Sequence, residues 1–451
     1  MQPETDRGTD KPAPADMPVG AYRFDRASGR LTCRAGAAIP LGRRATTLLS
    51  ILADHVGQEV SSSYLLDRVW PGQIVDPANV AVQISGLRAA IGDSDGSVIL
   101  TVHGRGYRLA VPNQPHAIGN IPHTLAPLSG REVELANVLK LMRRDRLLVI
   151  TGLSGTGKTR LALAAARALA PDFPDGQWLV GLNGVPAPAA DMLAARIAAP
   201  LGLNIQGALV ATLLAAIGQR QCLLVLDGAE LLGDGALDLV LRIMESCPQA
   251  GILITSHVAH RRLRPYCVRL SPLGMPGVED DRTPAAATSL FLEAASAAGL
   301  DFHGDQAAAP TIARICRHLG GVPLGVEIAA RATSLLGLDA TASASRDPMH
   351  ALPGMRRPGP SRHHSVSAAM GWAFNLLTPS ERQALRALAD QPGDFAMPEA
   401  EKLLADQGQP SRPAGWLGSL HEKSMLERSA GDRFTLNPLV RACAQNMPRP
   451  S

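Results

Sequence analysis

Residues 152–159 constrain this chain more than any other segment, because they match the pattern G-x-x-x-x-G-K-[ST]. The segment follows the short apolar run 147–151 and opens an Ala- and Leu-rich helical stretch, 158–170. In this context glycines let backbone N–H groups surround a phosphate, and the helix N-terminus adds partial positive charge. The sequence therefore predicts a nucleotide-phosphate site formed by Gly152, Gly155, Gly157, Lys158 and Thr159.

Two acids downstream are the candidate catalytic residues. Lys158 is expected to reach the β- and γ-phosphates, and the Thr159 hydroxyl to hold Mg²⁺. Asp227 ends the apolar run 223–226, where a second Mg²⁺ ligand belongs. Glu230 is the nearest acid able to orient an attacking water. The alternative for Asp227 is an ordinary aspartate at the end of a strand, and the alternative for Glu230 is a solvated glutamate after that strand.

The middle of the chain alternates between strand-like and helical sequence. Strand candidates at 147–151, 177–182, 222–227 and 251–255 are each bounded by helical stretches. Such alternation predicts a parallel sheet covered on both faces. The overall expectation is a multidomain chain of α/β and α+β parts, with this parallel sheet in its central part.

Composition limits the partners. The 451 residues carry a net charge of only +4, so a DNA contact must be local rather than spread over the chain. The six cysteines are scattered without metal-ligand spacing, and no apolar run approaches the ~20 residues of a membrane helix. We expect a reduced, cytoplasmic protein without a membrane partner.

An ordered set of segments resembles the NB-ARC group of STAND P-loop ATPases. The set consists of residues 128–132, 152–159, 223–230, 252–256 and 321–330. The resemblance implies a switch in which ADP holds a closed form and ATP permits an open, self-associating form. It also implies that Arg131, Ser256 and Pro323 lie at the nucleotide.

The chain departs from that family at three positions. Gly228 stands where relatives often have a second Asp or an Asn, and His257 where they have an arginine that senses the γ-phosphate; Arg261 and Arg262 are the nearest substitutes. At the place of a Met-His-Asp motif, this chain has Leu-Asn-Pro. Asn437 therefore either donates a hydrogen bond to phosphate or caps the last helix.

The C-terminal part resembles the winged helix that follows the NB-ARC core. Residues 365–377 have helical apolar spacing, and Thr378 with Glu381 forms a capping box with proline at the first helical position. A helix at 416–424 and two short strands within 425–436 follow.

The N-terminal part resembles the OmpR/PhoB-type winged-helix DNA-binding domain. Short strands at 22–24, 30–33 and 38–41 precede helices at 44–56, 61–70 and 76–91 and a hairpin through 104–106. The ending 101–109, Thr-Val-His-Gly-Arg-Gly-Tyr-Arg-Leu, is its most specific part. The helix 76–91 is expected in the major groove. Candidate DNA contacts, each with a solvated surface position as its alternative, are Arg43, Arg44, Asn79, Gln83, Arg88, Arg105 and Arg108.

Breaks in composition divide the chain into seven parts. Pro- and Gly-containing segments mark the boundaries. The expected parts are a disordered tail (1–19), the DNA-binding domain (20–112), a linker (113–127), the NTPase domain (128–272), the helical subdomain (273–336), a second linker (337–364) and the second winged helix (365–447).

The leading hypothesis is a transcription regulator whose binding to double-stranded promoter DNA is controlled by ATP or ADP with Mg²⁺. Since Arg88 is the only cation within 76–91, one copy is expected to bind weakly, and a homo-oligomer on tandem half-sites gains by avidity. RNA polymerase or an unidentified signalling protein is a further candidate partner, and no helical sensor repeat is recognisable in the sequence. The alternatives are an ATPase with genuine turnover that uses the winged helix for docking, and a DNA-binding scaffold indifferent to nucleotide.

Overall fold

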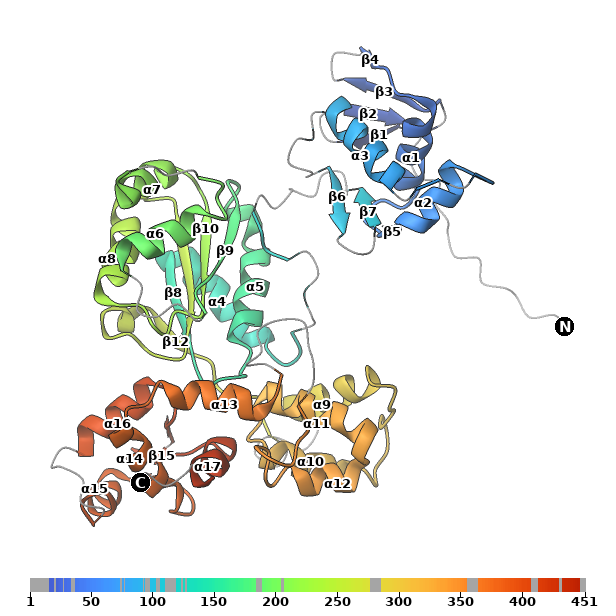
Figure 1. The fold of residues 1–451 in the computed structure, drawn as a ribbon. Coiled ribbons are helices and arrows are strands. Elements are labelled where there is room, and N and C mark those ends of the chain that lie inside the picture. Colours follow the sequence, from blue (N-terminus) through green and yellow to red (C-terminus); the bar gives the residue numbers. More distant parts are fainter. Residues whose placement is uncertain are drawn as a thin grey trace. The chain divides into compact units, whose positions relative to one another are not determined.

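The computed structural model divides the chain into two compact units, residues 1–116 and 117–451 (Figure 1). Their boundary falls within the expected linker 113–127, and each unit is described by itself. The structure describes residues 16–19, 22–26, 28–33, 37–73, 75–76, 78–91, 93, 98–102, 106–109, 119–122, 125, 128–183, 189–203, 207–275, 285–354, 364–406, 413–429 and 432–446.

The first unit is a winged-helix domain with three helices between two antiparallel sheets, as predicted. The helices are α1 (Arg43–Asp54), α2 (Ser62–Val69) and α3 (Ala78–Ala90). One sheet has the order β1-β2-β3-β4: Asp16–Val19, Tyr22–Asp25, Arg30–Cys33 and Ala38–Ile39. The other has the order β5-β7-β6: Val60–Ser61, Gly106–Leu109 and Ile99–Val102.

Two local features hold this unit in shape. The Ser61 side chain caps α2 by accepting a hydrogen bond from Tyr64 N. Gly106 has φ +145°, and a Cβ there would lie 2.1 Å from the carbonyl oxygen of Val60, so strand β7 passes β5 too closely for any side chain. Strand β1 begins at Asp16, so residues 16–19 of the expected tail 1–19 belong to the sheet instead; residues 1–15 lie outside the described residues.

The second unit begins with a five-stranded, fully parallel sheet in the order β12-β8-β11-β10-β9. Every residue of β8, β10 and β11 is buried, because helices cover both faces; this is why these strands are continuous apolar runs. The strands are β8 (Leu147–Thr151), β9 (Gln177–Gly181), β10 (Leu223–Asp227), β11 (Gly251–Ser256) and β12 (Cys267–Arg269).

Helices on the two faces build two separate cores. The core of α4 (Glu132–Asp145) and α5 (Lys158–Ala168) lies on one face (Figure 1). The opposite core contains α6 (Ala190–Ala198), α7 (Leu209–Ile217) and α8 (Asp234–Ser246). Two short 3-10 helices, Ala170–Asp172 and Arg261–Tyr266, complete this part.

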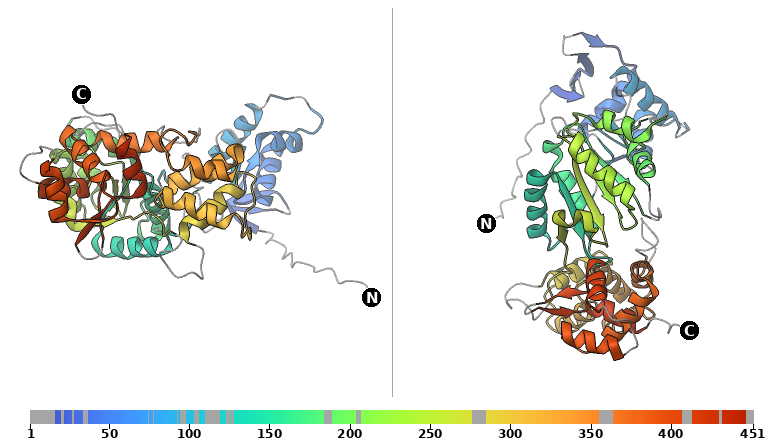
Figure 2. Two further views of the ribbon diagram at one scale, coloured as in Figure 1. Left: turned by 90° about the horizontal axis from the view of Figure 1, so that it is seen from below. Right: turned by 90° about the vertical axis from the view of Figure 1, so that its left-hand side faces the viewer.

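A second block of helices follows the sheet and shares one hydrophobic core. Helices α9–α12 lie next to α13–α17 (Figures 1 and 2). The first group is α9 (Ala286–Ser296), α10 (Ala309–His318), α11 (Pro323–Leu336) and α12 (Leu338–Ala344). The second group is α13 (Val366–Asn375), α14 (Pro379–Ala389), α15 (Met397–Asp406), α16 (Pro413–Glu422) and α17 (Pro438–Gln445).

A small sheet, β13-β15-β14 (Phe395–Ala396, Arg433–Thr435 and Glu427–Arg428), accompanies α14–α17. The predicted capping box of α14 is confirmed, since Thr378 and Glu381 each bond the other's backbone. Residues 364–446 are called the C-terminal module below; its assignment as a second winged helix stays a prediction.

The expected linker 337–364 differs from the structure in its first part. Helix α12 occupies Leu338–Ala344, because Gly337 turns the chain and Thr341 and Ala342 are then buried against the preceding helices. The helical subdomain therefore extends beyond residue 336. Residues 355–363 of this segment lie outside the described residues.

All six cysteines are free thiols, and burial raises the pKa of Cys316 to about 12, so this thiol stays protonated. No helix in the described part of the chain combines the length and apolar character that crossing a bilayer requires.

Candidate functional site

Glycines shape the loop between β8 and α5. A Cβ on Gly152 (φ +152°) would lie 2.5 Å from the carbonyl oxygen of Leu270, and one on Gly155 (φ +79°) 2.8 Å from Leu324 Cβ. Gly157 (φ +94°) is the N-cap of α5 in the left-handed region. Side chains at these positions would strain or displace the loop, so the backbone itself forms the cradle that the sequence predicts.

Lys158 and Thr159 stand at the start of α5. Lys158 Nζ donates hydrogen bonds to the carbonyl oxygens of Gly152 and Leu153, both at 2.9 Å. The lysine is buried, so its ammonium group is held over the loop rather than in solvent. A phosphate in the cradle would meet both this charge and the helix N-terminus.

Asp227 contacts polar groups from the start of α5 and from the ends of the two strands that flank β10. Its Oδ1 accepts hydrogen bonds from Thr159 Oγ1 (2.5 Å) and Thr255 Oγ1 (2.7 Å). Its Oδ2 accepts from Asn183 Nδ2 at 3.3 Å. The cluster lies at the carboxyl ends of parallel strands, where open α/β sheets bind ligands. Sequence reasoning named Thr159 and Asp227 but missed Asn183 and Thr255.

The same cluster suits Mg²⁺ bound jointly with phosphate. A hydroxyl and a carboxylate are hard oxygen ligands, and Mg²⁺ usually takes one or two such groups plus phosphate oxygens and water. The described residues contain no group of three or more His, Cys, Asp or Glu placed to hold a metal by themselves.

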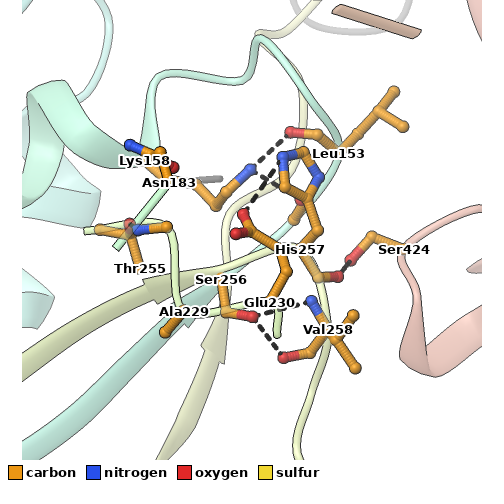
Figure 3. A network of polar contacts seen from close by, with 12 residues as sticks. Leu153, Lys158, Asn183, Ala229, Glu230, Thr255, Ser256, His257, Val258 and Ser424 are labelled. Atoms are coloured by element: carbon orange, nitrogen blue, oxygen red, sulfur yellow. Dashed lines mark hydrogen bonds and ion pairs between the residues drawn. The ribbon is translucent and has the colours of Figure 1, made fainter. Parts of the chain in front are cut away.

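Glu230 and His257 are buried next to this cluster (Figure 3). His257 Nε2 lies 3.6 Å from Glu230 Oε1. From the other side, Ser424 of the C-terminal module donates its hydroxyl to the backbone oxygen of His257 at 3.0 Å. Ser256 Oγ accepts from Val258 N and donates to Val258 O, which fixes the turn after β11. One strand end thus contacts both the candidate catalytic acid and a distant module.

Arg131 and Pro323 lie on either side of the loop. The buried Arg131 guanidinium donates to the carbonyl oxygens of Ser271 (2.7 Å) and Thr156 (3.4 Å). Pro323 is the first residue of α11, and the next residue, Leu324, donates its N–H to Gly155 O at 3.1 Å. Direct contact of Arg131, Ser256 or Pro323 with a nucleotide stays a prediction.

Asn437 lies at the N-cap of α17. Its Oδ1 accepts from Leu439 N (3.0 Å), and its Nδ2 donates to Gly320 O (2.8 Å). This is the capping alternative, with an added tie to the turn before α11; a phosphate contact of Asn437 stays a prediction. Arg261 and Arg262 are the candidate substitutes for the arginine that senses the γ-phosphate in relatives. Arg262 forms an ion pair with Asp238 on α8.

The candidate DNA contacts of the first unit differ in accessibility. Arg43 and Arg44 are exposed in the first turn of α1, and Asn79 is exposed on α3. Gln83 and Arg108 are half-buried. Arg88 turns toward β6, where its guanidinium bonds Ile99 O and Thr101 Oγ1. Arg105 lies outside the described residues.

Two family models match the chain. One, described as "Transcriptional regulatory protein, C terminal", matches residues 36–109. The other, described as "AAA domain", matches residues 141–263. The first unit is therefore an OmpR/PhoB-type DNA-binding domain, and the parallel sheet belongs to a P-loop ATPase module. The chain combines a domain for double-stranded DNA with a module of the nucleotide-binding kind.

Two relatives and one solved structure extend the comparison. "Uncharacterized protein Rv0894" of Mycobacterium tuberculosis is 31% identical over 284 residues, which cover 62% of this chain and 70% of the relative. "Regulatory protein AfsR" of Streptomyces griseus is 27% identical over 355 residues, or 73% of this chain and 34% of AfsR. This chain thus spans about a third of AfsR.

The solved structure supports the fold of the second unit. The Walker-type ATPase PABY2304 of Pyrococcus abyssi covers 70% of this chain and 95% of its own, with a TM-score of 0.50 and 14% identity. At that identity the similarity concerns the fold alone.

Proposed function

Because the chain belongs to the family of Uncharacterized protein Rv0894 of Mycobacterium tuberculosis, we propose a function for it from its own residues: a cytoplasmic transcription regulator whose DNA binding is controlled by ADP or ATP in the phosphate loop. The observation that carries the proposal is the position of His257. This residue directly follows β11, whose Thr255 bonds Asp227; it lies against Glu230, and its backbone oxygen accepts a hydrogen bond from Ser424 of the C-terminal module. A switch needs two states that a ligand can distinguish, and we propose that the bound phosphates bias this end of β11.

The first step is at the nucleotide. ATP and ADP share the β-phosphate that the glycine loop and Lys158 suit, and Mg²⁺ would add charge neutralisation through Thr159 and Asp227. The two nucleotides differ in the γ-phosphate. We propose that Glu230 and His257, which are buried together at the end of β11, respond to it.

The second step is the docking of the C-terminal module on the sheet. The segment 421–426, called the docking loop, contacts the end of β11 and the edge strand β12. Ala259 N donates to Glu422 O (2.9 Å), and Arg264 pairs with the Glu422 carboxylate. Arg269 on β12 donates to Leu426 O (2.8 Å). A change at His257 would thus be passed directly to the docking loop.

The electrostatics of this contact favour one docked state. Burial, with the charge of Arg269, lowers the pKa of His421, so the ring is neutral at pH 7 and accepts from the Arg269 guanidinium (Nη1 to Nε2, 3.1 Å). Burial also raises the pKa of Glu427, while Arg269 opposes that shift. If the C-terminal module moved away, Arg269 and Glu427 would be separated while still partly buried, which costs free energy. This cost favours two discrete arrangements of the module over a gradual movement.

The proposal extends to assembly. Self-association in the ATP form on tandem half-sites would compensate for the single cation of residues 76–91 by avidity. We also propose contact with RNA polymerase or with a signalling protein. This part is supported only by the presence of a DNA-binding domain typical of transcription regulators.

A second candidate function is genuine ATP turnover. The buried Glu230 close behind Asp227 favours it, because a carboxylate at this place can orient the attacking water. Steady-state phosphate release separates the two candidates. A switch predicts at most slow release, whereas turnover predicts release at the rates typical of ATP-driven enzymes and its loss in Glu230→Gln.

The proposed function itself is tested by selecting duplexes from a random library with the full chain, under ADP, a non-hydrolysable ATP analogue and no nucleotide. Enrichment that depends on the nucleotide supports the switch. Equal enrichment in all three conditions leaves a DNA-binding scaffold, and no enrichment contradicts regulation through DNA.

A further inference from the structure

We infer that Asn183 is a positioning residue of the magnesium site: the nitrogen of its amide orients the Asp227 carboxylate, and the oxygen accepts a hydrogen bond from a water bound to Mg²⁺. The inference rests on the proposed function, because it concerns the place at which ATP and ADP would bind. It assigns a role to a residue just beyond β9, next to a position, Gly228, that has no side chain of its own.

The register of the sheet brings Asn183 to the end of β10. Gly181 on β9 lies opposite Asp227, and the N–H of the next residue, Leu182, donates to Asp227 O at 2.8 Å. One residue further along, Asn183 Nδ2 donates to Asp227 Oδ2 at 3.3 Å. Figure 3 shows Asn183 together with Thr255 at this end of the sheet. The parallel pairing of the strands thus fixes where the amide lies.

The two carboxylate oxygens of Asp227 have different partners. Oδ1 accepts hydrogen bonds from the hydroxyls of Thr159 and Thr255. Oδ2 accepts from Asn183, which is the donor that the described part of the chain gives it. Donors behind a metal-binding carboxylate fix its orientation and raise its affinity for the metal. Asn183 therefore controls the orientation of the oxygen that the two threonines leave unbound.

The oxygen of the Asn183 amide is an acceptor in need of a donor. Oδ1 is buried and has no hydrogen-bond partner among the residues that the structure describes. A buried polar atom in this condition costs free energy unless a ligand or water satisfies it. Mg²⁺ bound through carboxylate and phosphate keeps several waters, and each of them is a donor. Because Oδ1 belongs to the amide that contacts Asp227, it can accept from a water of an ion held by that carboxylate.

Gly228 leaves the space that the amide fills. Its φ is +81°, and its N–H donates to Thr255 Oγ1 at 3.0 Å. A Cβ at this position would lie 1.7 Å from Asn183 Oδ1 and 2.5 Å from Asn183 Cγ. A side chain at position 228 and the amide of Asn183 therefore exclude each other. The polar group beside Asp227 comes from the neighbouring strand because the residue after Asp227 is glycine.

The test measures binding of a fluorescent, non-hydrolysable ATP analogue to the full chain while free Mg²⁺ is varied, with EDTA as the zero point. In wild type, Mg²⁺ should strengthen binding. Asn183→Ala should raise the Mg²⁺ concentration of half-maximal effect about ten-fold or more, the usual consequence of removing a partner of a metal ligand. The affinity in EDTA should be unchanged, because Asn183 acts through the ion.

Two results with Asn183→Ala would overturn the inference. One is a Mg²⁺ dependence identical to that of wild type. The other is an equal loss of affinity with and without Mg²⁺, which would mark a residue that only supports the fold. Asn375→Ala, which removes an exposed asparagine at the end of α13, is the control and should behave as wild type.

A double variant tests whether positions 183 and 228 share one place. Asn183→Ala combined with Gly228→Asn moves the amide to the residue after Asp227, and asparagine adopts the left-handed region more readily than most residues. The double variant should regain part of the Mg²⁺ affinity that Asn183→Ala loses. Gly228→Asn alone should lower that affinity, because the two side chains collide. A further loss in the double variant would overturn the shared place.

The outcomes separate this inference from the proposed function. If wild type binds the analogue and responds to Mg²⁺ while Asn183→Ala does not differ from it, the nucleotide site stands and the role of Asn183 is overturned. Binding in wild type that is indifferent to Mg²⁺ also overturns the inference alone. If wild type binds no nucleotide, the proposed function fails at its first step and the inference fails with it.

Discussion

At the scale of single residues, Lys158 is the positive charge that the phosphate loop offers to a nucleotide. Its ammonium group bonds two carbonyl oxygens of the loop, and it is buried with them. A phosphate would offer this charge a stronger, anionic partner at the same place.

We expect Lys158→Ala to weaken ADP and ATP binding at least ten-fold, since a hydrogen bond to a charged group contributes about 1.5–3 kcal/mol. Fluorescent nucleotide titration measures the affinity, with Lys140→Ala, an exposed lysine on α4, as the control. Unchanged affinity in a folded Lys158→Ala protein would contradict the assignment of the site.

Asp227 shows how much of the site could be predicted from sequence. Thr159 and Asp227 belong to recognisable patterns, so their pairing was predictable. Asn183 and Thr255 join them only because β9 and β11 flank β10 in the sheet, and strand order is not written in any local pattern. Arg88 shows what spacing along a helix cannot predict: its guanidinium bonds the carbonyl oxygen of Ile99 on β6, and a base contact of Arg88 stays a prediction.

At the scale of elements, the start of α14 ties the C-terminal module together. Glu381 closes the capping box and also accepts hydrogen bonds from Lys423 Nζ (2.6 Å) and Ser419 Oγ (2.5 Å). Burial alone would raise the pKa of Glu381, but these donors, with Thr378 N, outweigh it and lower the pKa. The carboxylate thus links α14 to α16 and to the docking loop.

We expect the stability contributed by Glu381 to be present above about pH 5 and to be lost as the pH falls through its lowered folded-state pKa. Glu381→Gln should destabilise α14 by about 1–2 kcal/mol at pH 7 and remove this pH dependence. Hydrogen exchange of the α14 amides, corrected for intrinsic rates, measures both effects. Glu401→Gln, an exposed glutamate on α15, is the control, and equal protection in the two variants would refute the role of Glu381.

The elements themselves were largely predictable. Apolar runs predicted the buried strands, and the capping box of Thr378 and Glu381 predicted the start of α14. Helix α12 was missed because its Ala, Thr and Ser residues carry little apolar periodicity, and only burial against α10 and α11 stabilises it. Tertiary packing, not local propensity, decides such short helices.

At the scale of the whole molecule, the docking loop connects parts far apart in sequence. Ser424 is buried, has φ +59° although it is not glycine, and contacts His257 across 167 positions. A serine held in the left-handed region costs free energy that its surroundings must offset. No sequence pattern points to this contact, because it depends on how the two modules pack.

We expect Ser424→Ala to loosen the docking loop, since it removes the hydroxyl that holds His257 O. The amide of Ala259, which donates to Glu422 O, should then exchange about five- to ten-fold faster. Exchange mass spectrometry of the peptide 257–264 measures this change. Ser343→Ala, an exposed serine on α12, should have no effect, and equal exchange in all three proteins would show that Ser424 does not hold the module.

The central claim is a coupling between the phosphate loop and the DNA-binding domain, and anisotropy titration of a selected duplex with the full chain tests it most directly. We predict that affinity with ADP and with a non-hydrolysable ATP analogue differs at least five-fold, the lower end of usual coupling energies, and that Lys158→Ala removes the difference. Equal affinities in wild type, at saturating concentrations of each nucleotide, would contradict the account.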